Sequence, residues 1–176
     1  MEIEKVLDSQ TIYEGRILDL NVENIELPSG KRTTREIVRH RGAVVIVAVD
    51  SKENTFLVRQ YRSALKKPLL EVPAGKTELG ELPEKTACRE LIEETGYSAG
   101  SMEALGGFYA GPGYSTEYLH LFYATDLKST EVVPDDDEIA EVLRVPLAEI
   151  PGMIASGEIC DSKSVAGLLR VIYKIW

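Results

Sequence analysis

The stretch from Gly75 to Tyr97, GKTELGELPEKTACRELIEETGY, carries the most distinctive pattern in this chain of 176 residues. It opens with a loop, and the part from Pro83 to Thr95 predicts a helix. Proline suits the first turn of a helix, and glycine, here Gly96, suits the position just past its end. We therefore expect a helix that follows a glycine-containing turn. We expect the side chains on one face of this helix to carry the chemistry of the protein.

Three carboxylates are expected together on this helix. Residues three and four apart lie side by side, so Glu90, Glu93 and Glu94 share one face. A different face, which can pack on a sheet, is expected to carry Ala87, Cys88, Leu91 and Ile92. Like charges four residues apart cost about 0.2–0.5 kcal/mol, so the acidic face favours a cation, and magnesium takes oxygen ligands. The alternative is a solvated acidic surface, which is the usual role of such a helix considered alone.

The spacing of the whole stretch decides between these alternatives. Gly75 is followed after five residues by Glu81, and after seven more by the run RELIEETGY, which ends at Tyr97. This pattern resembles the Nudix box, G-x5-E-x7-R-E-U-x-E-E-x-G-U, where U is a bulky apolar residue. Every fixed position matches, and the aromatic Tyr97 at the last U is a mild departure. The resemblance implies a Nudix hydrolase, with an α/β/α sandwich around a mixed sheet.

Segments outside the box resemble bacterial ADP-ribose pyrophosphatases. They are REIVRH at 35–40 before Gly42, VRQYR at 58–62, LEVPAG at 70–75, the proline of the GPGYS turn at 111–115, and the acidic run at 135–138. Each alone has an ordinary explanation as a surface arginine, a turn proline or a solvated loop. Their joint order implies hydrolysis of ADP-ribose to AMP and ribose 5-phosphate. The alternatives are other nucleoside diphosphate sugars, dinucleoside polyphosphates, oxidised nucleotides, or a catalytically silent domain that senses ADP-ribose.

The resemblance also implies a set of metal ligands. Ala74 offers its carbonyl, and Glu90 and Glu94 offer their carboxylates, to magnesium, with manganese as the alternative ion. Glu93 lies beside them and shares a second metal, and it is also an alternative catalytic base. We expect two or three ions per site.

Further roles follow from the same resemblance. Glu138 matches the glutamate proposed as the catalytic base in this family. Arg35 and Arg62 match positions that hold the diphosphate or the terminal ribose. Glu71 and Pro112 are further candidates for substrate binding, Pro112 because a proline at this distance past the box marks the ADP-ribose group of the family.

The chain as a whole predicts an α/β fold in two parts, residues 1–41 and 42–176. Before Gly42, strand character from Thr11 to Leu27 and a returning strand from Thr33 to His40 indicate a small antiparallel β unit. After it, the run GAVVIVAV at 42–49 predicts a central strand that is buried on both faces. ADP-ribose enzymes of this family are homodimers with exchanged N-terminal β units. The resemblance therefore implies that residues 1–41 serve dimerisation and substrate contacts.

The composition of the chain limits the partners and the cellular location that we expect for the protein. The 20 Lys and Arg against 29 Asp and Glu leave a net charge of −9, without the basic footprint of a nucleic-acid binder, so we expect a small-molecule substrate. The apolar run at 43–49 is too short to cross a bilayer, and the first residues lack the apolar stretch of a signal peptide. A cytoplasmic location and no membrane partner are expected. Cys88 and Cys160 are isolated and are expected to be small core residues.

Overall fold

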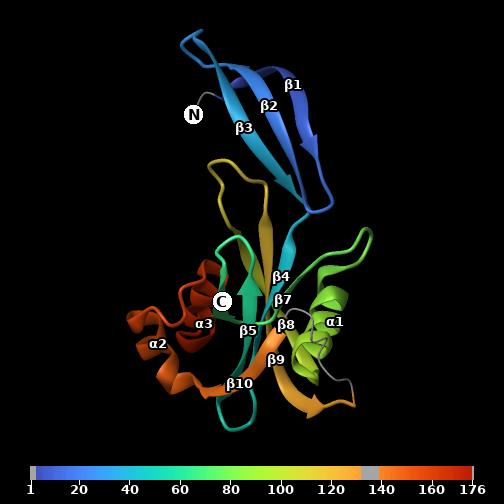
Figure 1. The fold of residues 1–176 in the computed structure, drawn as a ribbon, viewed down its shortest axis with the longest axis vertical. Helices are drawn as coiled ribbons and strands as arrows, with labels where there is room; N and C mark the ends of the chain where they lie inside the picture. Colours follow the sequence, from blue (N-terminus) through green and yellow to red (C-terminus); the bar gives the residue numbers. More distant parts are fainter. Residues whose placement is uncertain (1–2, 132–138, 176) are drawn as a thin grey trace. The chain divides into compact units, whose positions relative to one another are not determined.

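The computed structural model describes residues 3–131 and 139–175, which form two compact units (Figure 1). The N-terminal unit comprises the residues up to Gly42 together with Tyr109–Tyr118. Its antiparallel sheet has the order β1-β2-β3, with strands β1 (Lys5–Glu14), β2 (Leu18–Glu26) and β3 (Arg32–His40). The segment Tyr109–Tyr118 joins this unit because the N–H of Val38 donates to the carbonyl of Tyr114 at 2.7 Å.

The larger unit comprises Ala43–Phe108 and the residues from Leu119 onward. One sheet has the order β7-β4-β9-β8 and another the order β10-β5-β6. Because β4 runs parallel to β9 and antiparallel to β7, the first sheet is mixed. The elements are β4 (Ala43–Ala48), β5 (Asn54–Arg62), β6 (Lys67–Glu71), β7 (Ala74–Lys76), α1 (Pro83–Thr95), β8 (Tyr97–Tyr109), β9 (Tyr118–Ser129), β10 (Ile139–Pro146), η1 (Leu147–Glu149), α2 (Ile150–Ser156) and α3 (Ser162–Ile172).

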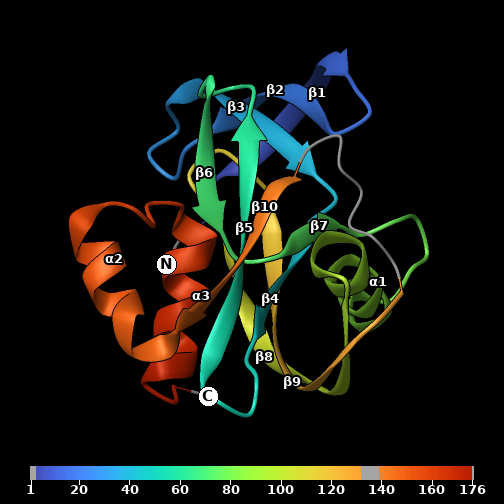
Figure 2. The same ribbon diagram turned by 60° about the horizontal axis from the view of Figure 1, so that its bottom comes forward.

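Strand β4 explains the layers of the larger unit. Successive side chains of a strand point to opposite faces of the sheet. Val45 and Val47 belong to one buried cluster, which includes Leu168 of α3. Val44 and Ile46 belong to the other cluster, together with residues of α1. Figure 2 shows α1 on one side of the strands and α2 with α3 on the other, so the unit is the expected α/β/α sandwich.

Helix α1 begins and ends at the predicted residues, Pro83 and Thr95. Gly96 follows in the left-handed conformation with φ of 74°, and its N–H donates to the carbonyl of Ile92. A residue with a Cβ is disfavoured in this conformation, which is why glycine commonly ends a helix. The buried Ala87 and Leu91 pack this helix against the sheet.

The N-terminal unit and β8 differ from the expectations. The predicted strand from Thr11 to Leu27 is interrupted, because Gly15 turns the chain and donates to the carbonyl of Leu18 at 3.1 Å. The unit therefore has three strands. Strand β8 was not expected, since its sequence YSAGSMEALGGFY contains three glycines, which strands disfavour, and its pairing with β9 outweighs this weak propensity.

The prediction that both cysteines are core residues is wrong, because Cys88 and Cys160 are exposed. Cys88 lies one residue past the buried Ala87, which is about 100° further round the helix and away from the sheet. Within the described residues, no helix is long and apolar enough to span a membrane.

Candidate active site

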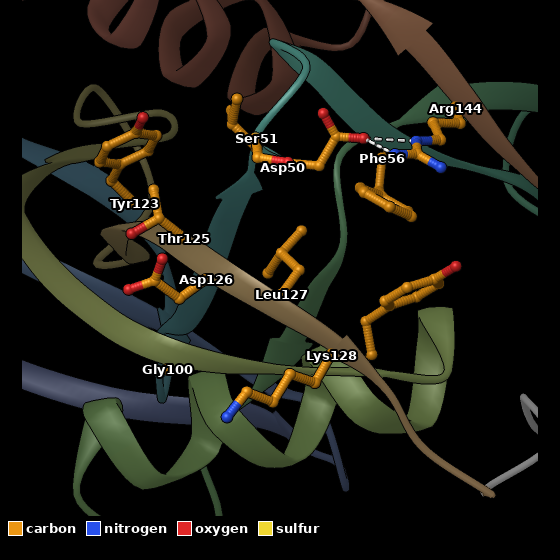
Figure 3. Close-up of a pocket in the computed structure, with 12 residues that line it drawn as sticks. Asp50, Ser51, Phe56, Gly100, Tyr123, Thr125, Asp126, Leu127, Lys128 and Arg144 are labelled. Atoms are coloured by element: carbon orange, nitrogen blue, oxygen red, sulfur yellow. Dashed lines mark hydrogen bonds and ion pairs between the residues drawn. The ribbon is translucent and has the colours of Figure 1, made fainter.

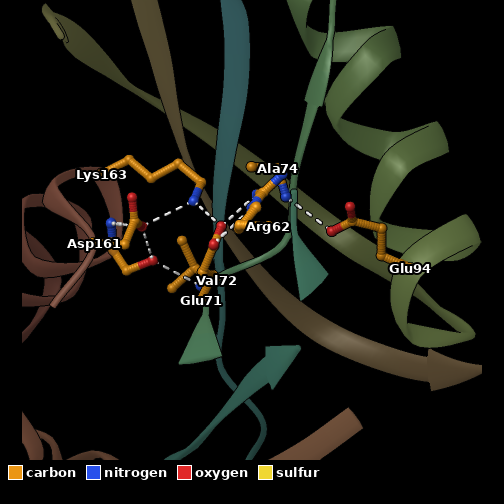
Figure 4. Close-up of polar contacts among 8 residues, drawn as sticks. Arg62, Glu71, Val72, Ala74, Glu94, Asp161 and Lys163 are labelled. Carbon is orange, nitrogen blue, oxygen red and sulfur yellow. Dashed lines mark hydrogen bonds and ion pairs between the residues drawn. The ribbon is translucent and has the colours of Figure 1, made fainter. Parts of the chain in front are cut away.

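Two carboxylates of α1 converge on neighbouring backbone positions. Glu94 is buried, and its Oε2 accepts a hydrogen bond of 2.9 Å from the N–H of Ala74 (Figure 4). The carboxylate of Glu90 lies against Gly75, where an added Cβ would stand 1.8 Å from the Glu90 carboxyl carbon. Only glycine leaves room for this carboxylate. The two glutamates, one helical turn apart, therefore meet the strand β7 at consecutive residues.

These carboxylates suit a divalent cation. The pKa of Glu94 is raised to about 8, chiefly by burial and also by the nearby Glu90 carboxylate, against the lowering effect of the Ala74 N–H. Burial likewise raises the pKa of Glu90. A buried anion is costly unless it is paired, and a hard cation with oxygen ligands neutralises two such anions at once. The two carboxylates and the backbone of Ala74 thus fit a magnesium-type ion.

Arg89 organises the outer part of the acidic face. Its Nη1 donates to Glu90 and to Glu93, both at 2.8 Å, and its Nη2 donates to Glu81 at 3.0 Å. The hydrogen bonds from Arg89 hold the pKa of Glu81 at about 2. The side chain of Glu93 is 47% exposed, so it faces solvent beside the buried pair. The arginine of the box therefore fixes the orientation of the glutamates.

The three glutamates do not form a complete metal cage by themselves. Over residues 3–131 and 139–175, no group of three or more His, Cys, Asp or Glu side chains is arranged to hold a metal ion. The helix places Glu90 and Glu94 against β7, whereas Glu93 pairs with Arg89. Two carboxylates and a backbone carbonyl leave further positions of an ion to water and substrate oxygens, as magnesium commonly requires.

A second buried carboxylate, Glu71, lies in a network beside this site (Figure 4). Its Oε1 accepts from Nε of Arg62 at 2.7 Å, and its Oε2 accepts from Nη2 of Arg62 and from Nζ of Lys163. Lys163 also donates to Asp161 at 2.8 Å. We call Arg62, Glu71, Asp161 and Lys163 the charged quartet. It holds two anions and two cations.

Hydrogen bonds connect the quartet to the backbone next to Ala74, the residue whose carbonyl is a candidate metal ligand. Asp161 caps α3 by accepting from the N–H of Ser164 at 3.0 Å. The hydroxyl of Ser164 in turn accepts from the N–H of Val72 at 2.9 Å. Val72 lies two residues before Ala74, so the first turn of α3 is tied to the chain that enters β7.

Two further predicted site residues belong to the N-terminal unit. Arg35 is on β3 of the N-terminal unit, where its Nη2 donates to Glu4 at 2.9 Å. Pro112 belongs to the Tyr109–Tyr118 segment of the same unit. Glu138, the predicted base, falls outside the described residues.

The sequence reasoning missed Lys163 and Asp161. Asp161 precedes the apolar periodicity of the last helix, which is a signal for a helix N-cap, and this signal could have located the start of α3. No local pattern indicates that Lys163 meets Glu71, because 92 residues separate the two in sequence.

The larger unit also has a separate open hollow of about 670 Å³ (Figure 3). Its polar groups include Asp50 and Arg144, which form an ion pair, and the Arg144 guanidinium carbon lies 5.7 Å from the centre of the Phe56 ring. Asp50 follows the end of β4, whereas Ala74 pairs with Val45 inside that strand. Because Asp50 and Arg144 neutralise each other, the glutamates at Ala74 are the candidate active site.

Two family models match consecutive parts of this chain. Residues 38–166 match the model of the NUDIX domain, and residues 4–38 match that of the nucleoside diphosphate sugar hydrolase N-terminal domain. A crystal structure of an ADP compounds hydrolase has a TM-score of 0.88 and 23% sequence identity, and the match covers 99% of this chain and 95% of that one. The predicted Nudix fold is therefore confirmed.

Two relatives share 42% of their aligned residues with the chain. One is the ADP-ribose pyrophosphatase of Bacillus subtilis (strain 168), over 92% of this chain and 88% of the relative. The other is the methanol dehydrogenase activator of Bacillus methanolicus, over 92% and 89%. Because a domain model spans most of the chain and relatives this similar cover nearly all of it, the chain belongs to the Nudix hydrolase family.

Proposed function

We propose that the protein hydrolyses the pyrophosphate bond of ADP-ribose to give AMP and ribose 5-phosphate, in a reaction that depends on magnesium. The convergence of Glu90 and Glu94 on Ala74 and Gly75 is the observation that carries this proposal. The name of the Bacillus subtilis relative, ADP-ribose pyrophosphatase, supports the choice of substrate.

The metal ligands in this proposal are the carbonyl of Ala74 and the carboxylates of Glu90 and Glu94, with Glu93 sharing a further ion. We expect two or three magnesium ions, with manganese as a substitute. When bound, such ions neutralise the charge of a diphosphate and lower the pKa of a coordinated water. Nudix hydrolases in general require a divalent metal, and the buried and mutually repelling pair Glu90 and Glu94 supports such a requirement here.

The protein's own groups have separate tasks in this reaction. Arg89 holds Glu90 and Glu93 in place through hydrogen bonds of 2.8 Å. A general base must reach the attacking water, and Glu138 is proposed for this task, with Glu93 as the alternative. The exposure of Glu93 supports its access to water. No covalent enzyme intermediate is required.

Substrate binding is assigned to Arg62, Arg35, Glu71 and Pro112. The Arg62 side chain is 36% exposed while Glu71 neutralises its other edge, so its guanidinium can meet a diphosphate or a ribose. In this proposal Arg35 and Pro112 belong to a β unit that completes the site. Residues 42–176 supply the hydrolase machinery.

We further propose a cytoplasmic homodimer in which residues 1–41 are exchanged between the two chains. All ten residues of β1 are exposed in the isolated chain. Its apolar side chains include Val6, Ile12 and Tyr13, each more than half exposed, and a strand with such residues favours a partner. Light scattering at assay concentration is the test, and an active monomer at nanomolar concentration would contradict the exchange.

The experiment that tests the activity is a substrate panel with magnesium, in which AMP release from ADP-ribose is compared with hydrolysis of ADP-mannose, GDP-mannose and diadenosine polyphosphates. We expect the highest kcat/KM for ADP-ribose. A preference for another member assigns that substrate instead. Tight ADP-ribose binding without turnover would indicate a sensor and would reject the proposed reaction.

A further inference from the structure

The charged quartet is electrically balanced but unevenly buried. Glu71 is 1% exposed, Lys163 12% and Asp161 17%, whereas Arg62 is 36% exposed. Burial by itself raises the pKa of Glu71, but hydrogen bonds and charges from Arg62 and Lys163 outweigh burial and lower it. Arg62 is therefore the member of the quartet whose charge reaches solvent, and the other three lie behind it.

The hydrogen bonds determine the orientation of Arg62. Its Nε and Nη2 both face Glu71, one on each carboxylate oxygen, which is the bidentate arrangement that a planar guanidinium favours. Lys163 donates to the same Glu71 Oε2 that accepts from Nη2 of Arg62, and it also donates to Asp161. Since Lys163 neutralises Asp161, Arg62 is left to pair with Glu71 through one edge only.

We propose that Lys163 is a positioning residue that fixes the guanidinium of Arg62 towards the substrate by sharing Glu71 and by neutralising Asp161. This inference rests on the proposed function, in which Arg62 binds the diphosphate or ribose. Glu71 then contributes to substrate binding through Arg62. Lys163 itself contacts neither the substrate nor the metal.

Loss of the lysine charge changes the balance of the quartet. Glu71 and Asp161 would then be two anions that share one cation, and the charge of Asp161 already acts on Arg62 in the intact protein. A buried anion left without its partner attracts the nearest cation, because leaving it unpaired is costly. Arg62 is expected to turn inward and to lose part of its contact with the substrate.

The first test compares Lys163→Met with Lys85→Met, an exposed lysine in the first turn of α1, with ADP-ribose as substrate. Lys163→Met should raise KM about tenfold, which lies in the range of coupling through a shared network, while kcat stays within about twofold. Lys85→Met should leave both constants unchanged. A Lys163→Met enzyme with wild-type KM would overturn the inference, as would an equal loss in the control.

A double-mutant cycle then tests whether Lys163 acts through Arg62. Arg62→Met removes the group that Lys163 positions, so adding Lys163→Met to Arg62→Met should raise KM by less than about twofold. If the two effects on KM multiply in full, Lys163 acts independently of Arg62 and the inference is wrong.

A third readout does not need turnover and so separates this inference from the proposed function. NMR with 15N-labelled arginine follows solvent exchange of the Arg62 Nε–H, which the hydrogen bond to Glu71 protects. Because Arg62 turns inward towards Glu71 and Asp161, Lys163→Met should slow this exchange at least about tenfold, and Lys85→Met should not. Unchanged or faster exchange overturns the inference whatever the substrate panel shows, whereas slower exchange in an enzyme that does not cleave ADP-ribose rejects only the proposed reaction.

If Lys163→Met fails to fold, a double variant that removes the charges of both Lys163 and Asp161 tests the inference instead. In Asp161→Asn with Lys163→Met, the remaining Arg62 and Glu71 balance each other, and asparagine keeps the cap on α3. We expect KM within about threefold of wild type, because the charges around Arg62 are balanced again. A KM as high as predicted for Lys163→Met would show that charge balance does not position Arg62.

Discussion

Glu71 and Glu94 are both buried carboxylates beside the same loop, yet their surroundings shift their pKa values in opposite directions. Glu71 is hydrogen-bonded to two cations, Arg62 and Lys163, and its pKa is lowered. Glu94 is hydrogen-bonded to the neutral N–H of Ala74, and burial raises its pKa to about 8. The protein neutralises the first anion with its own side chains, whereas the second is left for the cation of the proposed metal site. In that proposal, the difference separates a carboxylate that orients an arginine from a carboxylate that binds a metal.

The largest effect is expected for Glu94→Gln. The amide has nearly the same shape but no charge to offer a metal, and metal ions contribute several kcal/mol of transition-state stabilisation, so kcat should fall on the order of a thousandfold. The melting temperature should not fall, because an uncharged group is less costly to bury. Turnover at saturating magnesium and thermal unfolding measure the two effects. A near-normal rate would contradict the metal assignment.

The opposite result is expected for Glu71→Gln. This change leaves Arg62 and Lys163 without their shared anion, and removal of one partner from a buried ion pair destabilises a protein by about 3 kcal/mol. Urea unfolding measures the loss of free energy. Glu93→Gln is the matched control, because Glu93 is half exposed and should change stability by less than about 0.5 kcal/mol. If Glu71→Gln is as stable as the control, the comparison between the two buried carboxylates is wrong.

A smaller and more local effect is expected for Gly75→Ala. The added Cβ meets the carboxylate of Glu90, a flexible end that can move, so the fold should persist while the metal site is distorted. We expect magnesium affinity to fall about tenfold, as happens when a ligand loses its orientation. The control is Gly152→Ala on α2, where a Cβ meets nothing within 4 Å, and its metal titration should match wild type. Equal affinities in both variants would place Glu90 outside the site.

The two carboxylates also predict opposite dependences of stability on pH. In the presence of a chelator, unfolded Glu94 ionises near pH 4.5 while folded Glu94 keeps its proton to about pH 8. Between these values the folded state binds more protons, so this group's contribution to stability falls as pH rises. Glu71, with its lowered pKa, stabilises the fold above its ordinary pKa of 4.5 and loses this contribution as pH falls.

The Glu94 effect is isolated by comparing wild type with Glu94→Gln in chelator between pH 5 and 9. As pH rises from 5 to 8, the melting temperature of the variant should increase relative to that of wild type by roughly ten degrees. A constant difference between the two proteins across this range would show that Glu94 is ionised throughout and that its burial has little effect on its pKa.

Local signals in the sequence predicted part of this structure and failed for other parts. Helix α1 begins at Pro83 and ends before Gly96 as predicted, because proline and glycine act on the backbone next to them. Strand β8 was missed because its glycines weaken the local signal, and pairing with β9 supplies what propensity lacks. The predicted roles of all the site residues stay predictions.

The amino-acid sequence alone determined the family pattern, the acidic helix and the expectation of a metal, since all three depend on residues a few positions apart. Only the tertiary structure decided that Glu94 is buried against Ala74 and that Glu90 lies over Gly75. It also decided that Lys163 meets Glu71 across 92 residues of sequence. The physical reason is that burial and charge pairing depend on which distant segments pack together, and no short sequence pattern records that.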